Sequence, residues 1–141
     1  MCRENPWLIE VDDTYRGLQY CVVFNMDEGY RCGYAEIPEG HRLYNVNFCE
    51  NDIEQLSFCT FSGHIKGHNG FFFGWDHHHL CDNIDILTFE QVNKNLSEDE
   101  YIELLNHARE MAGNLEGSYS TKEDVVHECF EVIDIILNCK K

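Results

Sequence analysis

The stretch LQYCVVF, residues 18–24, is short and rich in apolar, aromatic and β-branched side chains. Such side chains fit a pleated, half-buried surface, so the stretch predicts a β-strand. Similar runs follow along the chain: CGYAEI (32–37), LSFCTF (56–61), FFFGW (71–75) and IDILTF (84–89). Turn residues separate them at 27–29, at 38–40 and in the glycine-rich stretch 62–70. We therefore expect an antiparallel sheet of about five to six strands within residues 15–92.

The apolar period changes to that of a helix after the sheet region. Residues 97–100, SEDE, form a capping box, in which Ser97 and Glu100 satisfy free backbone amides at a helix start. The apolar stripe that follows comprises Ile102, Leu105, Ala108 and Met111 or Ala112. A second box, Ser120 to Glu123, opens another helix, and its apolar positions are Val125, Val126, Cys129, Phe130, Ile133, Ile136 and Leu137. The expected fold is α+β, a single domain over residues 1–141 in which the sheet precedes two C-terminal helices within 97–138.

The charge balance restricts the partners of this chain. Its 26 Asp and Glu residues against 10 Lys and Arg give a net charge of −16 at pH 7. Such a chain repels phosphate backbones and anionic membranes, so polymeric nucleic acid and membranes are not expected partners. A small anionic ligand remains compatible, because several arginines in one pocket outweigh a diffuse field that salt screens. The start, MCRENPWLIEVDD, lacks a signal-peptide pattern, so we expect a cytoplasmic protein whose eight cysteines are reduced.

Eight histidines raise the question of a metal site. His64 and His68 are four residues apart, and His77 to His79 are contiguous, with Cys81 close behind. Adjacent residues on extended backbone point to alternating sides, so the three contiguous histidines cannot all bind one ion. The sequence also lacks CxxC and HExxH spacings. We therefore expect no metal and no cofactor.

Catalytic motifs are equally absent from the sequence. It contains no G-x-S-x-G elbow, no Walker loop and no G-x-G-x-x-G. His79 and Cys81 could be drawn as a base and nucleophile, but closeness in sequence does not give closeness in space. We expect no catalytic residues and no enzyme activity. Two kinds of ligand-binding side chain remain as candidates: arginines, whose guanidinium groups suit phosphates, and aromatic rings, which stack on bases. Each arginine could also simply pair with one of the many surface carboxylates.

Several segments resemble one known family. They are YRGLQYCVVF (15–24), MDEGYRCGYAEIPEGHRLY (26–44) and FFFGWDHHHLCDN (71–83). In these motifs and in length the chain is similar to the first characterised Thoeris anti-defence family, phage "sponge" proteins that sequester host immune signals. The resemblance is weak in the two helices. It also departs from the family pattern at Trp75 to His79, where members commonly read F-D-C-A-H, and at Cys81, commonly glycine.

The resemblance implies a non-catalytic binder in the cytoplasm of an infected bacterium. Family members capture glycocyclic ADP-ribose made by Thoeris TIR proteins, and some also capture cyclic trinucleotides of another defence system. They form homodimers, some assembling into hexamers, with ligand sites at subunit interfaces. Their fold, an antiparallel sheet followed by two helices, agrees with the fold expected from the residues. Two alternatives remain open: a metal-dependent or nucleotide-cleaving enzyme, and a protein decoy inhibitor.

Matched motif positions, together with the arginines that suit phosphate, give a set of ligand-binding candidates. They are Phe73, Asn83, Arg109, Arg31, Arg16, Phe71 and Asp76. The resemblance implies that Phe73 is the stacking ring, with Phe71 on the same strand face, and that Asn83 reads a base or ribose. Arg109 is the expected phosphate clamp, with Arg31 or Arg16 second. Asp76 and His79 are expected to shape the turn below the pocket.

Overall fold

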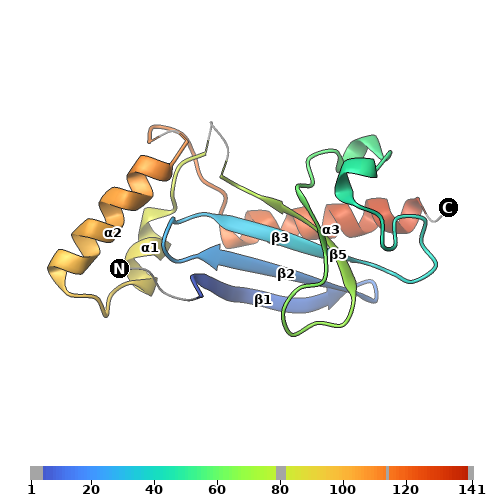
Figure 1. Cartoon of the computed structure of the whole chain (residues 1–141), viewed down its shortest axis with the longest axis horizontal. Helices are drawn as coiled ribbons and strands as arrows, with labels where there is room; N and C mark the ends of the chain where they lie inside the picture. The colour runs from blue at the N-terminus through green and yellow to red at the C-terminus, as the bar shows by residue number, and fades with distance from the viewer. Residues whose placement is uncertain (1–4, 79–81, 114, 140–141) are drawn as a thin grey trace.

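A computed structural model describes residues 5–78, 82–113 and 115–139. Five antiparallel strands form one sheet in the order β1-β2-β3-β5-β4, and helices follow it along the chain, which confirms the α+β prediction (Figure 1). The strands are β1 (Trp7–Tyr15), β2 (Leu18–Asn25), β3 (Arg31–Ile37), β4 (Phe61–Gly63) and β5 (Phe71–Asp76). The α-helices are α1 (Ile86–Val92), α2 (Glu98–Met111) and α3 (Lys122–Asn138).

Strands β2, β3 and β5 correspond to three of the predicted runs, and they form the centre of the sheet. Their apolar side chains are buried on both faces, as the continuous runs in the sequence require. On β2, Tyr20 and Val22 belong to the core cluster that also contains residues of α3. Cys21 and Val23 lie on the opposite face of the strand and are buried as well.

The prediction of a strand over residues 56–61 is wrong. The segment instead starts at the last residue of a short 3₁₀ helix, Glu54–Leu56, and the strand β4 begins only at Phe61. The buried residues of this region, Ile53, Leu56 and Cys59, are spaced by three. That period belongs to a 3₁₀ turn rather than to a strand.

The prediction of a strand over residues 84–89 is also wrong, because this segment holds the start of helix α1. Asp85 is the N-cap, and its Oδ1 accepts a hydrogen bond from the backbone N–H of Thr88. Asp85 and Phe89 are buried four residues apart, while Leu87 is 70% exposed. A short apolar run fits both a strand and a buried helix turn, and here the aspartate cap decides for the helix.

Strand β1 was not expected from the sequence. It forms the edge of the sheet and pairs with β2 from Trp7 to Tyr15, with a register shift between Ile9 and Val11. Most of its residues are exposed. An edge strand without a buried face has no clear apolar alternation, so it gave no strand pattern.

Both long helices begin with capping boxes. Ser97 and Glu100 bond each other's backbone N–H at the start of α2, as predicted. At α3 the box consists of Thr121 and Asp124, one residue further along than the predicted Ser120 and Glu123. Helix α2 buries Leu104 and Ala108 and leaves Ile102 of the predicted stripe exposed. Among the described helices, none combines the length and apolar character needed to cross a membrane.

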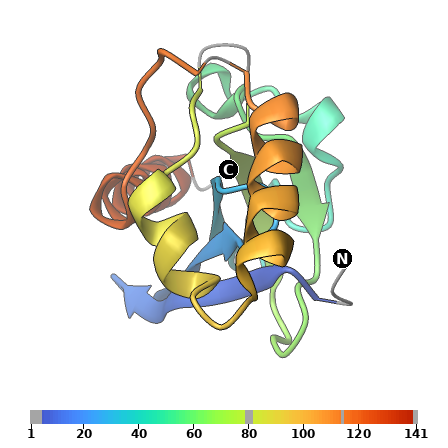
Figure 2. The ribbon, with the colours of Figure 1, turned by 90° about the vertical axis from the view of Figure 1, so that its left-hand side faces the viewer.

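Two hydrophobic clusters hold the layers together. The larger joins one face of the sheet to α3, which runs along the sheet and buries Val125, Cys129 and Ile133 against it (Figure 1). The smaller lies at one end of the sheet, where Phe24 of β2 meets Phe89 and residues of α2. Figure 2 shows this end, with α1 and α2 in front of the strands and α3 seen along its axis. The predicted helices therefore separate: α3 covers the sheet, and α2 closes its end.

Candidate functional site

The structure places the two predicted stacking rings in the core. Phe73 is fully buried and Phe71 is 6% exposed, and both belong to the cluster between the sheet and α3. Their ring centroids lie 6.2 Å apart in an edge arrangement. Neither ring therefore presents a free face to a ligand in this structure, because β5 pairs with β3 and β4 and its apolar side chains fill the interior.

Arg31 is buried in a network that uses all of its donors. Its guanidinium has five N–H groups, and it makes five hydrogen bonds. Two go to the carboxylate of Glu10, one to Asp85 at 2.7 Å, one to the carbonyl of Ser120 and one to the hydroxyl of Thr88. Since its side chain is only 3% exposed, Arg31 has no donor left for a phosphate. Its role in this structure is to join β1, β3, α1 and the segment before α3.

The carboxylate of Asp85 is stabilised by this network. Burial alone would raise the pKa of Asp85, but hydrogen bonds from Arg31 and Thr88 outweigh that effect and hold the pKa below its usual value. The same carboxylate caps α1. The arginine of the RCGY motif therefore fixes the start of a helix.

Arg16 lies at a turn on the surface. It has a φ of 52° and precedes Gly17, whose φ is 86°, so the Y-R-G motif forms the tight turn of the β1-β2 hairpin. The Arg16 guanidinium pairs with Asp134 of α3 at 2.8 Å, and both side chains remain about half exposed. Arg42 pairs with Asp52 in the same way. These arginines have the surface pairings that an acidic chain favours.

Two of the predicted residues, Asn83 and Arg109, line one pocket, which we call the Arg109 pocket. Its volume is about 550 Å³, within the range of small-molecule sites. It lies between the end of α2 and the segment before α3. The lining residues are Asn83, Ile84, Ile86, Arg109, Leu115, Gly117, Ser118, Tyr119 and Thr121.

Asn83 holds one wall of the Arg109 pocket in place. Its Nδ2 donates to the carbonyl of Leu115 at 2.8 Å, and its backbone N–H donates to the carbonyl of Ser118 at 3.0 Å. Its Oδ1 accepts from the backbone N–H of Ile84 at 2.7 Å. A side-chain amide has two N–H groups and two acceptor lone pairs, so one donor and one acceptor position remain for a ligand.

Arg109 supplies the positive charge of this pocket. It lies in the last turn of α2, where a cation interacts favourably with the helix dipole. Within residues 5–78, 82–113 and 115–139, no ion pair to Arg109 is found. Tyr119 lies in the same pocket and is 38% exposed, so its ring is accessible for stacking. The sequence gave no signal for Tyr119, because its segment has no strand or helix pattern.

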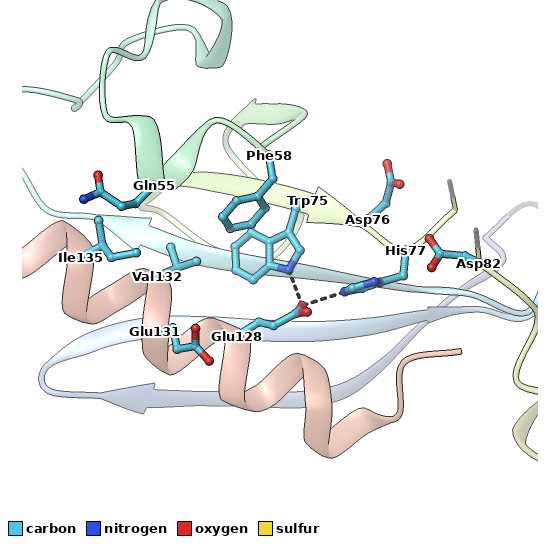
Figure 3. Close-up of a pocket in the computed structure, with 10 residues that line it drawn as sticks. All are labelled: Gln55, Phe58, Trp75, Asp76, His77, Asp82, Glu128, Glu131, Val132 and Ile135. Carbon is cyan, nitrogen blue, oxygen red and sulfur yellow. Dashed lines mark hydrogen bonds and ion pairs between the residues drawn. The ribbon is translucent and has the colours of Figure 1, made fainter. Parts of the chain in front are cut away.

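A second pocket, which we call the Trp75 pocket, has the opposite electrostatic character (Figure 3). Its volume is about 490 Å³, and Trp75 and Phe58 form an edge-on pair in its wall, 5.6 Å between ring centroids. The carboxylates in its lining are Asp76, Asp82, Glu128 and Glu131. These four acids repel an anionic ligand, so the Trp75 pocket does not suit a phosphate.

Glu128 organises the polar side of the Trp75 pocket. Its Oε1 accepts from Trp75 Nε1 at 2.9 Å and lies 2.7 Å from His77 Nε2 (Figure 3). Burial would lower the pKa of His77, but the Glu128 carboxylate, with Asp82 and Asp76 nearby, raises it overall. His77 Nδ1 in turn lies 3.1 Å from Ser120 Oγ.

Ser120, His77 and Glu128 thus have the residue types of a nucleophile, a base and an orienting acid. Ser120, however, is not among the residues that line the Trp75 pocket. The neighbouring carboxylates would also oppose the negative charge that develops on the carbonyl oxygen in acyl transfer. The arrangement instead links β5, α3 and the segment before α3.

Asp76 ends β5, as expected of a residue that shapes the turn. Its Oδ1 accepts from the backbone N–H of His78, and its Oδ2 accepts from the hydroxyl of Thr60. His79 and Cys81, which were considered as turn or catalytic residues, lie outside the described residues.

Comparisons with protein-family models, with curated proteins and with solved structures found no match.

Proposed function

We propose that this chain binds and sequesters a cyclic ADP-ribose isomer, glycocyclic ADP-ribose, in the Arg109 pocket without cleaving it. The observation that carries the proposal is the meeting of Arg109 and Asn83 in one pocket of ligand size. These residues are 26 positions apart in the sequence; the motif resemblance implies Asn83 as a ligand contact, and Arg109 is the expected phosphate clamp. In this role the chain is an anti-defence protein that acts in the cytoplasm of an infected bacterium.

The roles of the pocket residues follow from their chemistry. The Arg109 guanidinium binds the pyrophosphate through charge-assisted hydrogen bonds. The remaining donor and acceptor of Asn83 read a base or a ribose hydroxyl. Tyr119, rather than Phe73, stacks on a base, because the Tyr119 ring is accessible and the Phe73 ring is buried.

The binding free energy that a sponge needs supports the expected homodimer. A sponge needs nanomolar affinity, about −12 kcal/mol. One charge-assisted hydrogen bond contributes roughly 1.5–3 kcal/mol and one stacked base about 1–3 kcal/mol, and ordering the ligand costs part of that. One Arg109 pocket therefore falls short alone. A partner subunit that closes over the pocket adds burial and further contacts, so we propose a homodimer, with assembly to a hexamer as a further step.

The test is to mix the purified chain with glycocyclic ADP-ribose and measure the free ligand after ultrafiltration. A sponge removes the ligand from solution and returns it intact after heat denaturation, as mass spectrometry would show. An altered product would favour the enzyme alternative instead. Unchanged free ligand would reject the proposal and leave a protein decoy, which predicts co-purification with a defence protein. Cyclic trinucleotides assayed in parallel define the ligand range.

A further inference from the structure

Three potential metal ligands meet on the side of the sheet away from α3. They are Asp12 of β1, Cys21 of β2 and His68 of the segment between β4 and β5. His68 Nε2 lies 3.0 Å from Asp12 Oδ1 and 3.5 Å from Cys21 Sγ. Cys21 Sγ lies 3.4 Å from Asp12 Oδ1. The three donor atoms therefore form a compact triangle.

The triangle has the size of one face of a zinc tetrahedron. Zinc bonds of about 2.3 Å to sulfur and about 2.0–2.1 Å to nitrogen or oxygen, at tetrahedral angles, place ligand atoms roughly 3.3–3.6 Å apart. The two separations that involve Cys21 Sγ match this value. The separation between His68 and Asp12 is shorter by only about 0.3–0.4 Å. Side-chain rotation of the partly exposed Asp12 is enough to accommodate an ion.

The surroundings hold His68 as a metal ligand requires. Its Nδ1 lies 3.1 Å from the carbonyl of Lys66, which places a proton on Nδ1 and directs Nε2 toward Asp12 and Cys21. Its ring packs edge-on against Phe72, 5.6 Å between centroids. The His68 side chain is 6% exposed, so this orientation is fixed before an ion arrives.

An ion pair between His68 and Asp12 explains only part of the cluster. Such a pair accounts for the short contact between these two side chains, whereas the Cys21 thiol donates to the same Asp12 oxygen at 3.4 Å and also lies 3.5 Å from His68 Nε2. Cys21 is 1% exposed, and its Sγ approaches both other donors. Thiolate, imidazole and carboxylate together are ligands that Zn²⁺ accepts.

We propose that Asp12, Cys21 and His68 bind one Zn²⁺ ion per chain. Cys21 and His68 also line a cavity of about 260 Å³, from which a water molecule can supply the fourth ligand. The ion cross-links β1, β2 and the segment before β5. The site shares no residue with the Arg109 pocket, so the zinc proposal and the proposed function can be tested independently.

Cobalt titration tests the site directly. The purified full-length chain is stripped of metal under reducing conditions, and Co²⁺ is added while the absorption spectrum is recorded. We expect one Co²⁺ per chain, a thiolate-to-cobalt charge-transfer band and the visible bands of tetrahedral cobalt, all of which Zn²⁺ abolishes. Absence of the charge-transfer band in the wild type would overturn the proposal.

Matched variants assign the ligands. Cys21→Ser should lose the charge-transfer band, and Asp12→Asn and His68→Gln should each weaken cobalt affinity at least tenfold. Cys49→Ser and His107→Gln are the controls, because Cys49 is exposed and His107 is an exposed residue of α2 that does not line this cavity. The controls should keep the wild-type spectrum. Equal losses in controls and ligand variants would contradict the assignment.

A thermal measurement covers the case in which a buried substitution unfolds the chain. The side chain of Asp12 is 42% exposed, so Asp12→Asn should fold normally, which circular dichroism verifies. Added Zn²⁺ should raise the unfolding temperature of the wild type by clearly more than that of Asp12→Asn, because an ion bound only to the folded state stabilises it in proportion to the logarithm of its affinity. An equal increase in both proteins would refute the site.

Discussion

Gly33 lies directly opposite Trp75 across β3 and β5, and the next pair along, Tyr34 and Gly74, has the reverse order of glycine and aromatic residue. Each ring lies over the glycine of the facing strand: a Cβ built on Gly33 would lie 2.5 Å from Trp75 Cζ2, and one on Gly74 would lie 2.6 Å from Tyr34 Cδ1. The G-Y of RCGY and the G-W of FGWD are therefore partners in one sheet. Their joint presence has a packing reason that needs no ligand.

The first prediction concerns this pairing. Gly33→Ala should lower the free energy of unfolding by roughly 1–3 kcal/mol, because the new methyl group forces the buried Trp75 ring to move. Urea denaturation followed by tryptophan fluorescence measures the loss. Gly70→Ala is the control, since its Cβ would meet only the flexible end of Glu36. An equal loss in both variants would show that the ring contact is unimportant.

The second prediction concerns Arg31. Arg31→Met should cost about 3–5 kcal/mol of stability, because it leaves the carboxylates of Glu10 and Asp85 without their buried partner. Arg42→Met removes an exposed pair with Asp52 and should cost at most about 1 kcal/mol. Chemical denaturation of both variants gives the comparison. Similar losses would mean that the buried network adds nothing beyond a surface pair.

The third prediction concerns the pH dependence of stability through His77. Because the folded pKa of His77 is raised, the folded state holds this proton more tightly than the unfolded chain, whose histidines titrate near pH 6.5. The tighter proton binding contributes its full amount to the folding stability below about pH 6.5, and this stabilisation is lost as the pH rises through the folded pKa. His77→Gln should therefore lose less stability than the wild type between about pH 6 and about pH 8.

Denaturation at both pH values measures that difference. His64→Gln serves as the control, since His64 is an exposed histidine outside the Trp75 pocket. It should retain the wild-type change with pH. A wild-type profile in His77→Gln would contradict the role assigned to the contact between His77 and Glu128.

The fourth prediction separates the Arg109 pocket from the rings in the core. Arg109→Ala should weaken glycocyclic ADP-ribose binding at least tenfold, since it removes the phosphate clamp. Tyr119→Ala should weaken it about 5- to 150-fold, the equivalent of one stacked base. Phe73→Leu, which keeps a large apolar side chain in the core, should leave affinity within about threefold. Calorimetry on folded protein measures all three.

The opposite order of affinity losses among these variants would identify a different binding site. If Phe73→Leu abolished binding while Tyr119→Ala did not, the pocket would have to form near β5 in the assembled oligomer. Arg42→Ala is the surface control and should bind like the wild type, because Arg42 lies outside the Arg109 pocket.

Much of the fold was predictable because local chemistry specifies it. The runs at 18–24, 32–37 and 71–75 became β2, β3 and β5, and the serine box at residues 97–100 began α2. Short apolar runs were less informative. In runs of five to seven residues the period does not distinguish a strand from a helical turn, so 56–61 and 84–89 looked like the runs that became strands.

Of the candidate ligand contacts, the sequence supplied Arg109 and Asn83 but could not place them. Whether an arginine is free depends on which carboxylates lie near it in space. Arg31 is fully paired because Glu10 and Asp85, from separate segments, converge on it. No spacing in the sequence predicts that these two carboxylates meet the same arginine.

The amino-acid order alone determined the acidic charge, the central strands and the capped helices, because composition, alternation and capping act between neighbouring residues. Only the tertiary structure decided that Phe73 is interior, that Asn83 meets Arg109, and that Asp12, Cys21 and His68 converge. These relationships join residues up to 56 positions apart. They exist only after the sheet has formed and its loops have closed, so they depend on the packing of the whole chain.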